Sequence, residues 1–127
     1  MRSYLNSLRY ALEGFVQAFR TERNFKLFLA LYLLSFVLGW LFGIGPRDWQ
    51  ILIFTGGIFL AVELINTALE NFADAFDTHT KSQNDQHTRA IKATKDIAAA
   101  ASLVCAIAWG LILLIIFWPH ISGWMGR

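Results

Sequence analysis

Three long stretches without a charged side chain constrain this sequence more than any other feature. They are residues 27–44, residues 49–62 with their continuation 64–69, and residues 97–121. A helix needs roughly 20 apolar residues to cross a hydrocarbon core of about 30 Å, so each stretch can span a bilayer. Because 56% of the chain is hydrophobic and 16% is charged, a soluble domain is excluded. We therefore predict an all-α membrane protein, a single domain over residues 1–127, with spans over about 25–44, 49–72 and 90–118.

The segment before the first span has the pattern of a helix that lies on a membrane surface. Apolar side chains recur at helical spacing from Tyr4 to Phe19, and charged residues fall on the other faces. We predict an amphipathic surface helix over about residues 3–21. Gly14 interrupts it, and because a glycine inside a helix costs about 1 kcal/mol, we expect something to approach the backbone there. The segment shows no signal-peptide pattern, so we expect it to remain in the mature protein.

The basic residues predict which ends of the spans face the cytoplasm. Nine of the eleven Lys and Arg residues lie before the first span or around the start of the third. They are Arg2, Arg9, Arg20, Arg23, Lys26, Lys81, Arg89, Lys92 and Lys95. Because basic residues stay preferentially on the cytoplasmic side, we predict a cytoplasmic N-terminus. The polar run 77–89 has no apolar period and is expected to be a solvated loop, and Pro119 is expected to mark the outer end of the last helix.

Polar residues interrupt the second span at offsets of three, seven and eleven residues, which places them on one helical face. They are Glu63, Asn66, Glu70 and Asp74. An ionisable side chain inside a span costs several kcal/mol unless it faces a polar interior, so each acid is a functional candidate. A polar seam that only joins helices is the alternative, and Asn66 alone fits it equally well. Clustered carboxylates repel one another, however, unless cations or hydrogen-bond donors lie among them.

Charged residues that can accompany these carboxylates flank the first and third spans. Glu22 can meet Glu70 if the helices pack side by side, and two carboxylates with phosphate oxygens and water suit Mg²⁺. Lys95 and Asp96 lie at the start of the third span, where a lysine ammonium can hold a phosphate. The alternatives are an ordinary interfacial charge for Glu22 and a snorkelling side chain for Lys95.

Three segments together resemble the signatures of a known family. They are TERNF at residues 21–25, ELINTALE at 63–70 followed by Asp74, and KATKDIAAAA at 92–101. In order and in placement relative to the spans they are similar to the prokaryotic diacylglycerol kinase and undecaprenol kinase family, over nearly the whole chain. The TERNF form is more similar to the undecaprenol kinases. The stretch from Asp74 to Lys95 is longer than expected for the family, and Phe28 stands where relatives have a polar residue.

The resemblance implies a homotrimer in the bacterial cytoplasmic membrane, with active sites shared between subunits at the cytoplasmic face. It implies ATP and a lipid alcohol as substrates, Mg²⁺ as the metal, and no nucleic-acid partner. The alcohol is expected to be undecaprenol, with diacylglycerol as the alternative. The implied roles are Glu63 as the general base that contacts the lipid, Asn66 as a second catalytic residue, Glu22 and Glu70 as metal ligands, and Tyr10, Gly14, Glu22, Glu70, Asp74, Lys95 and Asp96 as nucleotide-binding residues.

Two other functional classes remain open from the sequence. A small ion-coupled transporter would carry a proton on Glu63, but it gives no reason for Glu22 and Lys95 to gather at the cytoplasmic boundary. A membrane scaffold would use the polar face only to specify packing, so Glu70→Gln would harm assembly and no activity would exist. Consumption of ATP that depends on an added lipid alcohol separates the kinase from both.

Overall fold

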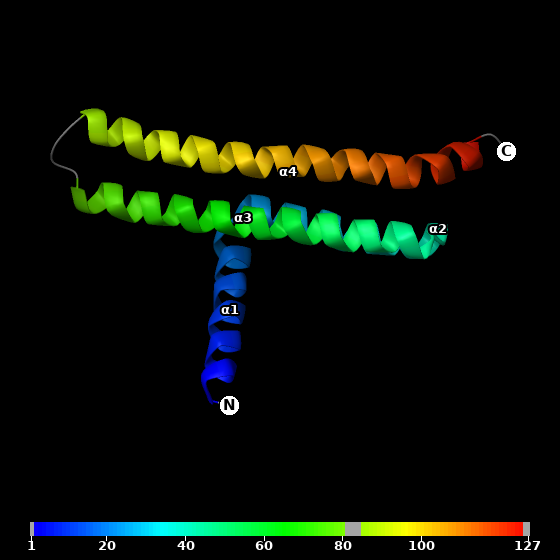
Figure 1. Ribbon diagram of the computed structural model, residues 1–127, viewed down its shortest axis with the longest axis horizontal. Coiled ribbons are helices and arrows are strands. Elements are labelled where there is room, and N and C mark those ends of the chain that lie inside the picture. Colours follow the sequence, from blue (N-terminus) through cyan, green and yellow to red (C-terminus); the bar gives the residue numbers. More distant parts are fainter. Residues whose placement is uncertain (1, 81–84, 126–127) are drawn as a thin grey trace.

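The computed structural model describes the backbone of residues 2–80 and 85–125 and the side chains of residues 4–77 and 88–123 (Figure 1). Its helices are α1 (Arg2–Thr21), α2 (Arg23–Phe42), α3 (Pro46–Thr80) and α4 (Asp85–Met125). The last three are long and apolar enough to cross a membrane. All regular structure in the described residues is helical, which confirms the predicted all-α fold of an N-terminal helix followed by three apolar helices.

Glu22 alone connects α1 to α2. Its backbone is extended, with φ −98° and ψ 117°, yet its N–H still donates to the Ala18 carbonyl over 2.9 Å. The Lys26 ammonium donates to the Arg20 carbonyl over 3.0 Å and so satisfies one of the carbonyls left without a partner where α1 ends. The chain therefore changes direction sharply at one residue, and α1 projects sideways from the body formed by α2, α3 and α4 (Figure 1).

A glycine cap ends α2 and opens the short turn to α3. Gly43 has φ 63° and ψ 43°, a left-handed conformation that a side chain would strain. Its N–H donates to Trp40, and the N–H of Ile44 donates to Gly39 over 3.1 Å, which is the Schellman pattern. Pro46 then starts α3, where its fixed φ suits a first helical residue and its missing N–H has no helical partner to lose. The turn between α2 and α3 is therefore only three residues long, from Gly43 to Gly45.

An aromatic layer holds the three long helices together. Trp109 of α4 stacks on Phe59 of α3, with ring centres 5.3 Å apart, and meets Tyr32 of α2 edge-on at 6.1 Å. Phe28 of α2 also meets Phe59 edge-on, with ring centres 4.8 Å apart, so this apolar residue makes a hydrophobic contact inside the body. Gly56 lies under Tyr32, where an added Cβ would come 2.3 Å from the ring, so the glycine permits this close approach.

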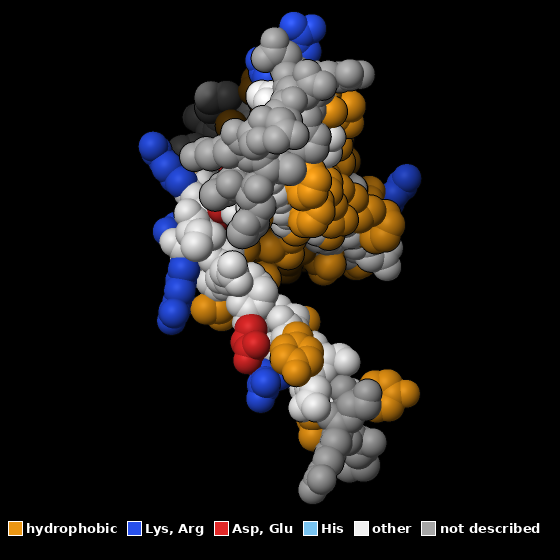
Figure 2. Space-filling view, turned by 90° about the vertical axis from the view of Figure 1, so that its left-hand side faces the viewer, with side chains coloured by type: hydrophobic (Ala, Val, Ile, Leu, Met, Phe, Trp, Pro, Cys, Tyr) orange, Lys and Arg blue, Asp and Glu red, His pale blue; other side chains and the backbone are white. Residues whose placement is uncertain are grey.

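The end of α1 anchors it to this body, and most of its apolar side chains stay uncovered. Ala18 is buried in one cluster with Phe25 of α2 and Leu60 of α3. From Tyr4 to Phe19 the large apolar side chains of α1 are all exposed. Figure 2 shows hydrophobic side chains gathered on one flank of the helical body, with Lys and Arg mainly on the other. Such an apolar helix face suits the boundary between lipid headgroups and acyl chains.

Two helix ends differ from the sequence-based expectation. The predicted loop over 77–89 is wrong for most of its length, because α3 continues to Thr80 and α4 begins at Asp85, while residues 81–84 lie outside the described part of the chain. Extending a formed helix adds a hydrogen bond per residue, so an apolar period is not required there. Pro119 also marks no helix end, since α4 continues through it to Met125. Lys81, used in the charge argument, falls outside the described residues.

Candidate active site

Glu63 is buried where α3 faces α4. Its side chain is 4% exposed, and its Oε2 accepts a hydrogen bond from the Ser102 hydroxyl of α4. The next residue, Leu64, packs on the cluster that anchors α1, so Glu63 lies at the depth where α1 joins the body. An ionised carboxylate buried without a donor would cost several kcal/mol, and the Ser102 hydroxyl reduces that cost.

Asn66 and Glu70 form the next contact along the same face of α3. The Asn66 amide nitrogen donates to Glu70 Oε1 over 3.2 Å, and Asn66 itself is 8% exposed. Its amide oxygen, Oδ1, is buried and has no hydrogen-bond partner among the described residues. Since a buried polar atom without a partner costs free energy, this oxygen is a place where a ligand or water would be stabilised.

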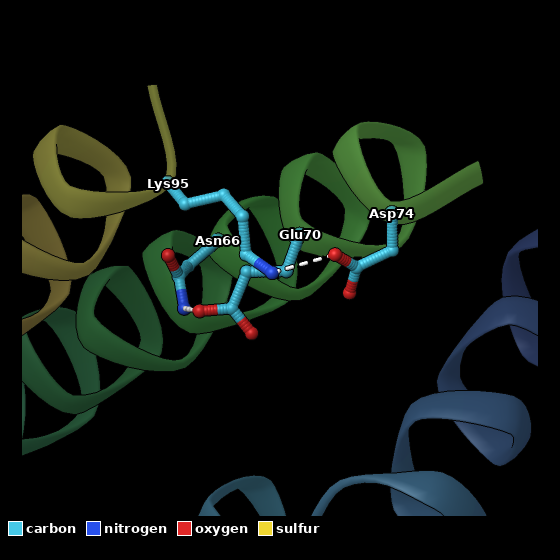
Figure 3. Close-up of polar contacts among 4 residues, drawn as sticks. All are labelled: Asn66, Glu70, Asp74 and Lys95. Atoms are coloured by element: carbon cyan, nitrogen blue, oxygen red, sulfur yellow. Dashed lines mark hydrogen bonds and ion pairs between the residues drawn. The ribbon is translucent and has the colours of Figure 1, made fainter. Parts of the chain in front are cut away.

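Lys95 crosses from α4 to the carboxylates of α3. Figure 3 shows its side chain extending over Glu70 toward Asp74, where Nζ lies 2.6 Å from Oδ1. The negative charges of Asp74, Glu70 and Asp77 all attract the Lys95 ammonium. A positive charge therefore lies among acids that would otherwise repel one another. The stripe predicted from the spacing thus faces α4, and α4 supplies both a hydroxyl and an ammonium to it.

Tyr10 and Gly14 line a separate pocket of about 700 Å³ between α1 and α3. On the α3 side its wall includes Leu64, Thr67 and Asn71. These α3 residues stand one position after Glu63, Asn66 and Glu70, so the pocket adjoins the face that carries the acidic residues. Nothing lies within 4 Å of the Cβ position of Gly14, so the space above this glycine is open.

Glu22 and Asp96 take no part in the α3–α4 cluster of the single chain. Glu22 is partly exposed and accepts a hydrogen bond of 3.4 Å from Thr21, and Asp96 is exposed on α4. In the described residues no three His, Cys, Asp or Glu side chains are grouped so that they could hold a metal ion. The pairing of Glu22 with Glu70 as metal ligands, and the nucleotide role of Asp96, stay predictions.

The sequence-based prediction missed Ser102, Thr67 and Asn71. Ser102 follows a run of alanines, and a small polar residue in such a run commonly serves only close helix packing. Thr67 and Asn71 carried a usable signal, because they stand four residues apart and both follow a member of the acidic stripe. Their position indicates a second polar face, turned toward α1.

The comparison with protein families decides between the functional classes left open by the sequence. Residues 9–117 match the model of the prokaryotic diacylglycerol kinase family. The chain belongs to this family. Membership makes it a lipid kinase and an integral membrane protein with the apolar helices α2, α3 and α4 in the bilayer. The transporter and scaffold alternatives are not needed to explain the polar residues of α3.

The relatives in the prokaryotic diacylglycerol kinase family include an undecaprenol kinase and diacylglycerol kinases. The chain is 31% identical to the undecaprenol kinase of Bacillus subtilis over 121 residues, which cover 95% of this chain and 93% of that protein. It is 28% identical to the diacylglycerol kinase of Pseudomonas aeruginosa over 120 residues, 90% of each chain. It is 33% identical to the diacylglycerol kinase of Helicobacter pylori over 106 residues, 84% of this chain and 77% of that one. The resemblance of the three signature segments to this family is therefore confirmed.

Proposed function

We propose that this lipid kinase transfers the γ-phosphoryl group of ATP to the hydroxyl of undecaprenol. Two observations support undecaprenol as the acceptor. One is the TERNF segment, and the other is the similarity to the Bacillus subtilis undecaprenol kinase over nearly the whole of both chains. Diacylglycerol is the second candidate, because several relatives are diacylglycerol kinases. Both lipids present a primary hydroxyl at the headgroup level.

The buried carboxylate of Glu63, at the depth where α1 joins the body, carries this proposal. A helix with the amphipathic pattern of α1 lies at the membrane interface, so Glu63 lies near the level that a lipid hydroxyl reaches while its tail stays in hydrocarbon. Ser102 contacts Oε2, and Oε1 is the atom that takes the hydroxyl proton. A carboxylate positioned in this way acts as a general base.

In the proposed reaction the lipid oxygen forms a bond to the γ-phosphorus while the bond from that phosphorus to the β–γ bridging oxygen breaks. The proton of the lipid hydroxyl moves to Glu63, and ADP leaves with the electron pair of the broken bond. Phosphoryl transfer asks a protein mainly for positioning and for neutralisation of charge. Lys95, held over Glu70 by Asp74, supplies a positive charge for the phosphates on the same face of α3.

The oxygen donors of this face fit Mg²⁺. Asn66 holds one oxygen of Glu70, whose carboxylate is partly exposed, and Asn66 Oδ1 adds a buried oxygen that no described residue engages. Mg²⁺ commonly takes one or two protein carboxylates and keeps several waters, so Glu70 and Glu22 are sufficient protein ligands. When bound, Mg²⁺ neutralises charge on the ATP phosphates.

The proposed site is cytoplasmic and shared between subunits of a homotrimer. The excess of basic residues before α2 and at the start of α4 supports a cytoplasmic N-terminus in the bacterial inner membrane. Tyr10 and Asp96 are exposed in the single chain, and Glu22 lies partly exposed beside α1. A neighbouring subunit can bring these residues to the face formed by Glu63, Glu70 and Lys95, with Tyr10 and Gly14 bordering the nucleotide.

A phosphorylation assay tests the proposed function. The purified protein in detergent micelles receives Mg²⁺, ATP labelled in its γ-phosphate, and equal mole fractions of undecaprenol and diacylglycerol. We expect label mainly in undecaprenyl phosphate, and no transfer once a chelator removes Mg²⁺. Preferential labelling of phosphatidic acid would assign diacylglycerol as the acceptor, and the absence of label in either lipid would overturn the proposed reaction.

A further inference from the structure

Ser102 is the α4 residue whose side chain hydrogen-bonds to the proposed base, Glu63. Successive contacts between the two antiparallel helices join Lys95 to Asp74, Ser102 to Glu63, and Trp109 to Phe59. Ser102 is 6% exposed, and Ala98, one turn before it, is buried on the same face. The small side chains let α4 approach α3 closely enough for a hydroxyl to reach the carboxylate.

The hydrogen bond of Ser102 differs from those of Ser35, Thr55 and Thr94, which also lie in the long helices. Ser35 donates to the Tyr32 carbonyl, and Thr55 and Thr94 donate to carbonyls four residues earlier, so each satisfies itself within its own helix. Ser102 instead donates across to Glu63 on α3. A serine inside an apolar helix needs no neighbour to satisfy its hydroxyl, so the choice of Glu63 is specific to this position.

We propose that Ser102 is a positioning residue for the phosphoryl transfer, which holds Glu63 through Oε2 so that Oε1 points at the lipid hydroxyl. The inference rests on the proposed role of Glu63 as the base. The hydroxyl fixes the rotation of a carboxylate that is otherwise attached to α3 through flexible torsions. Ser102 keeps its own proton throughout, and the lipid proton goes to Oε1.

Substitution of Ser102 separates this role from simple packing. Ser102→Ala removes the donor, and we expect kcat to fall about tenfold to a hundredfold, the range that corresponds to loss of one hydrogen bond to a charged group. KM for ATP is expected to stay within about twofold of the unmodified protein, because the hydroxyl acts through Glu63 alone. Ser102→Thr keeps a hydroxyl at the same carbon and is expected to restore most of kcat.

Ser35→Ala is the matched control. Ser35 is a serine of similar burial in α2, 2% exposed, whose hydroxyl stays within its own helix. We expect this variant to keep kcat. Thermal unfolding in the same detergent, followed by circular dichroism, must show both alanine variants folded at the assay temperature.

The outcomes distinguish this inference from the proposed function. If the unmodified protein phosphorylates lipid and Ser102→Ala matches it in kcat, the positioning role is wrong while the lipid kinase reaction stands. If Ser102→Thr fails to recover activity although it is folded, the hydroxyl is not what matters and the positioning role is again wrong. If the unmodified protein labels neither lipid, the proposed function itself fails.

Discussion

Lys95 of α4 reaches Asp74 of α3, with 2.6 Å between Nζ and Oδ1, and its side chain passes over Glu70 on the way (Figure 3). This contact joins the two antiparallel helices α3 and α4, which lie side by side (Figure 1). It holds one ammonium group above the proposed metal ligand before any nucleotide binds. Because the ammonium group is already in place, the Lys95 side chain needs little rearrangement when the ATP phosphates bind.

The first prediction concerns this ammonium. Lys95→Gln removes the positive charge and keeps a polar side chain that is one bond shorter. We expect kcat/KM for ATP to fall by at least about tenfold, because a charge-assisted hydrogen bond to phosphate is lost. Initial rates at varied ATP concentration with saturating lipid measure the change.

Lys92→Gln is the control for that variant. Lys92 is exposed on the same helix, one turn before Lys95, so the two variants lose the same charge at nearly the same place. Nearly unchanged kinetics are expected for Lys92→Gln. An equal loss in both variants would mean that only the general positive potential matters, and the specific contact of Lys95 would be refuted.

The second prediction concerns the packing of the three long helices. Gly56→Ala would bring a Cβ 2.3 Å from the Tyr32 ring and 3.0 Å from the Trp109 indole nitrogen. Tyr32 cannot move away easily, since its hydroxyl donates to the Ile53 carbonyl over 3.1 Å. We expect a loss of about 1–3 kcal/mol in the free energy of unfolding, the usual cost of overpacking, seen as a lower Tm.

Gly57→Ala provides the comparison at the neighbouring position. Nothing lies within 4 Å of the Cβ site of Gly57, and alanine favours a helix over glycine by about 1 kcal/mol. Its Tm is expected to be equal to or above that of the unmodified protein. Equal behaviour of the two variants would contradict the described packing of α2 against α3 and α4.

The third prediction concerns the pocket between α1 and α3. The Cβ of Gly14→Ala would meet no atom within 4 Å, and alanine favours a helix over glycine, so we expect the isolated protein to be at least as stable as before. If the nucleotide borders this pocket as proposed, the added methyl group narrows its approach and KM for ATP rises several-fold. If KM for ATP stays unchanged while Tm is not lowered, Gly14 does not border the nucleotide.

The sequence predicted the fold because its signals are strong and local. Uncharged stretches of span length indicated α2, α3 and α4, and the helical spacing of apolar residues before them indicated α1. The ends of the helices were harder to predict from the sequence. The polar end of α3 has no apolar period that would reveal a helix. A proline often ends a helix, but α4 continues through Pro119.

The sequence also predicted which face of α3 carries the polar residues, because the offsets from Glu63 to Asp74 follow the helical period. It indicated Lys95 as a charged residue that can accompany the carboxylates, but it did not predict that Ser102 contacts Glu63. The contact of Ser102 with Glu63 depends on the register of α4 against α3, and that register is set by packing of residues such as Phe59 and Trp109. Spacing within one helix contains no information on this register.

Glu63→Gln tests the central claim most directly, because it removes the basic oxygen while keeping the size of the side chain. General-base catalysis contributes typically 10²–10⁴-fold, so we expect kcat for lipid phosphorylation to fall by at least about 100-fold, with ATP binding and Tm nearly unchanged. The matched control is Glu13→Gln on α1, an exposed glutamate paired with Arg9 over 3.2 Å, which should keep full activity. A folded Glu63→Gln protein that phosphorylates lipid at the rate of the unmodified enzyme would contradict the account.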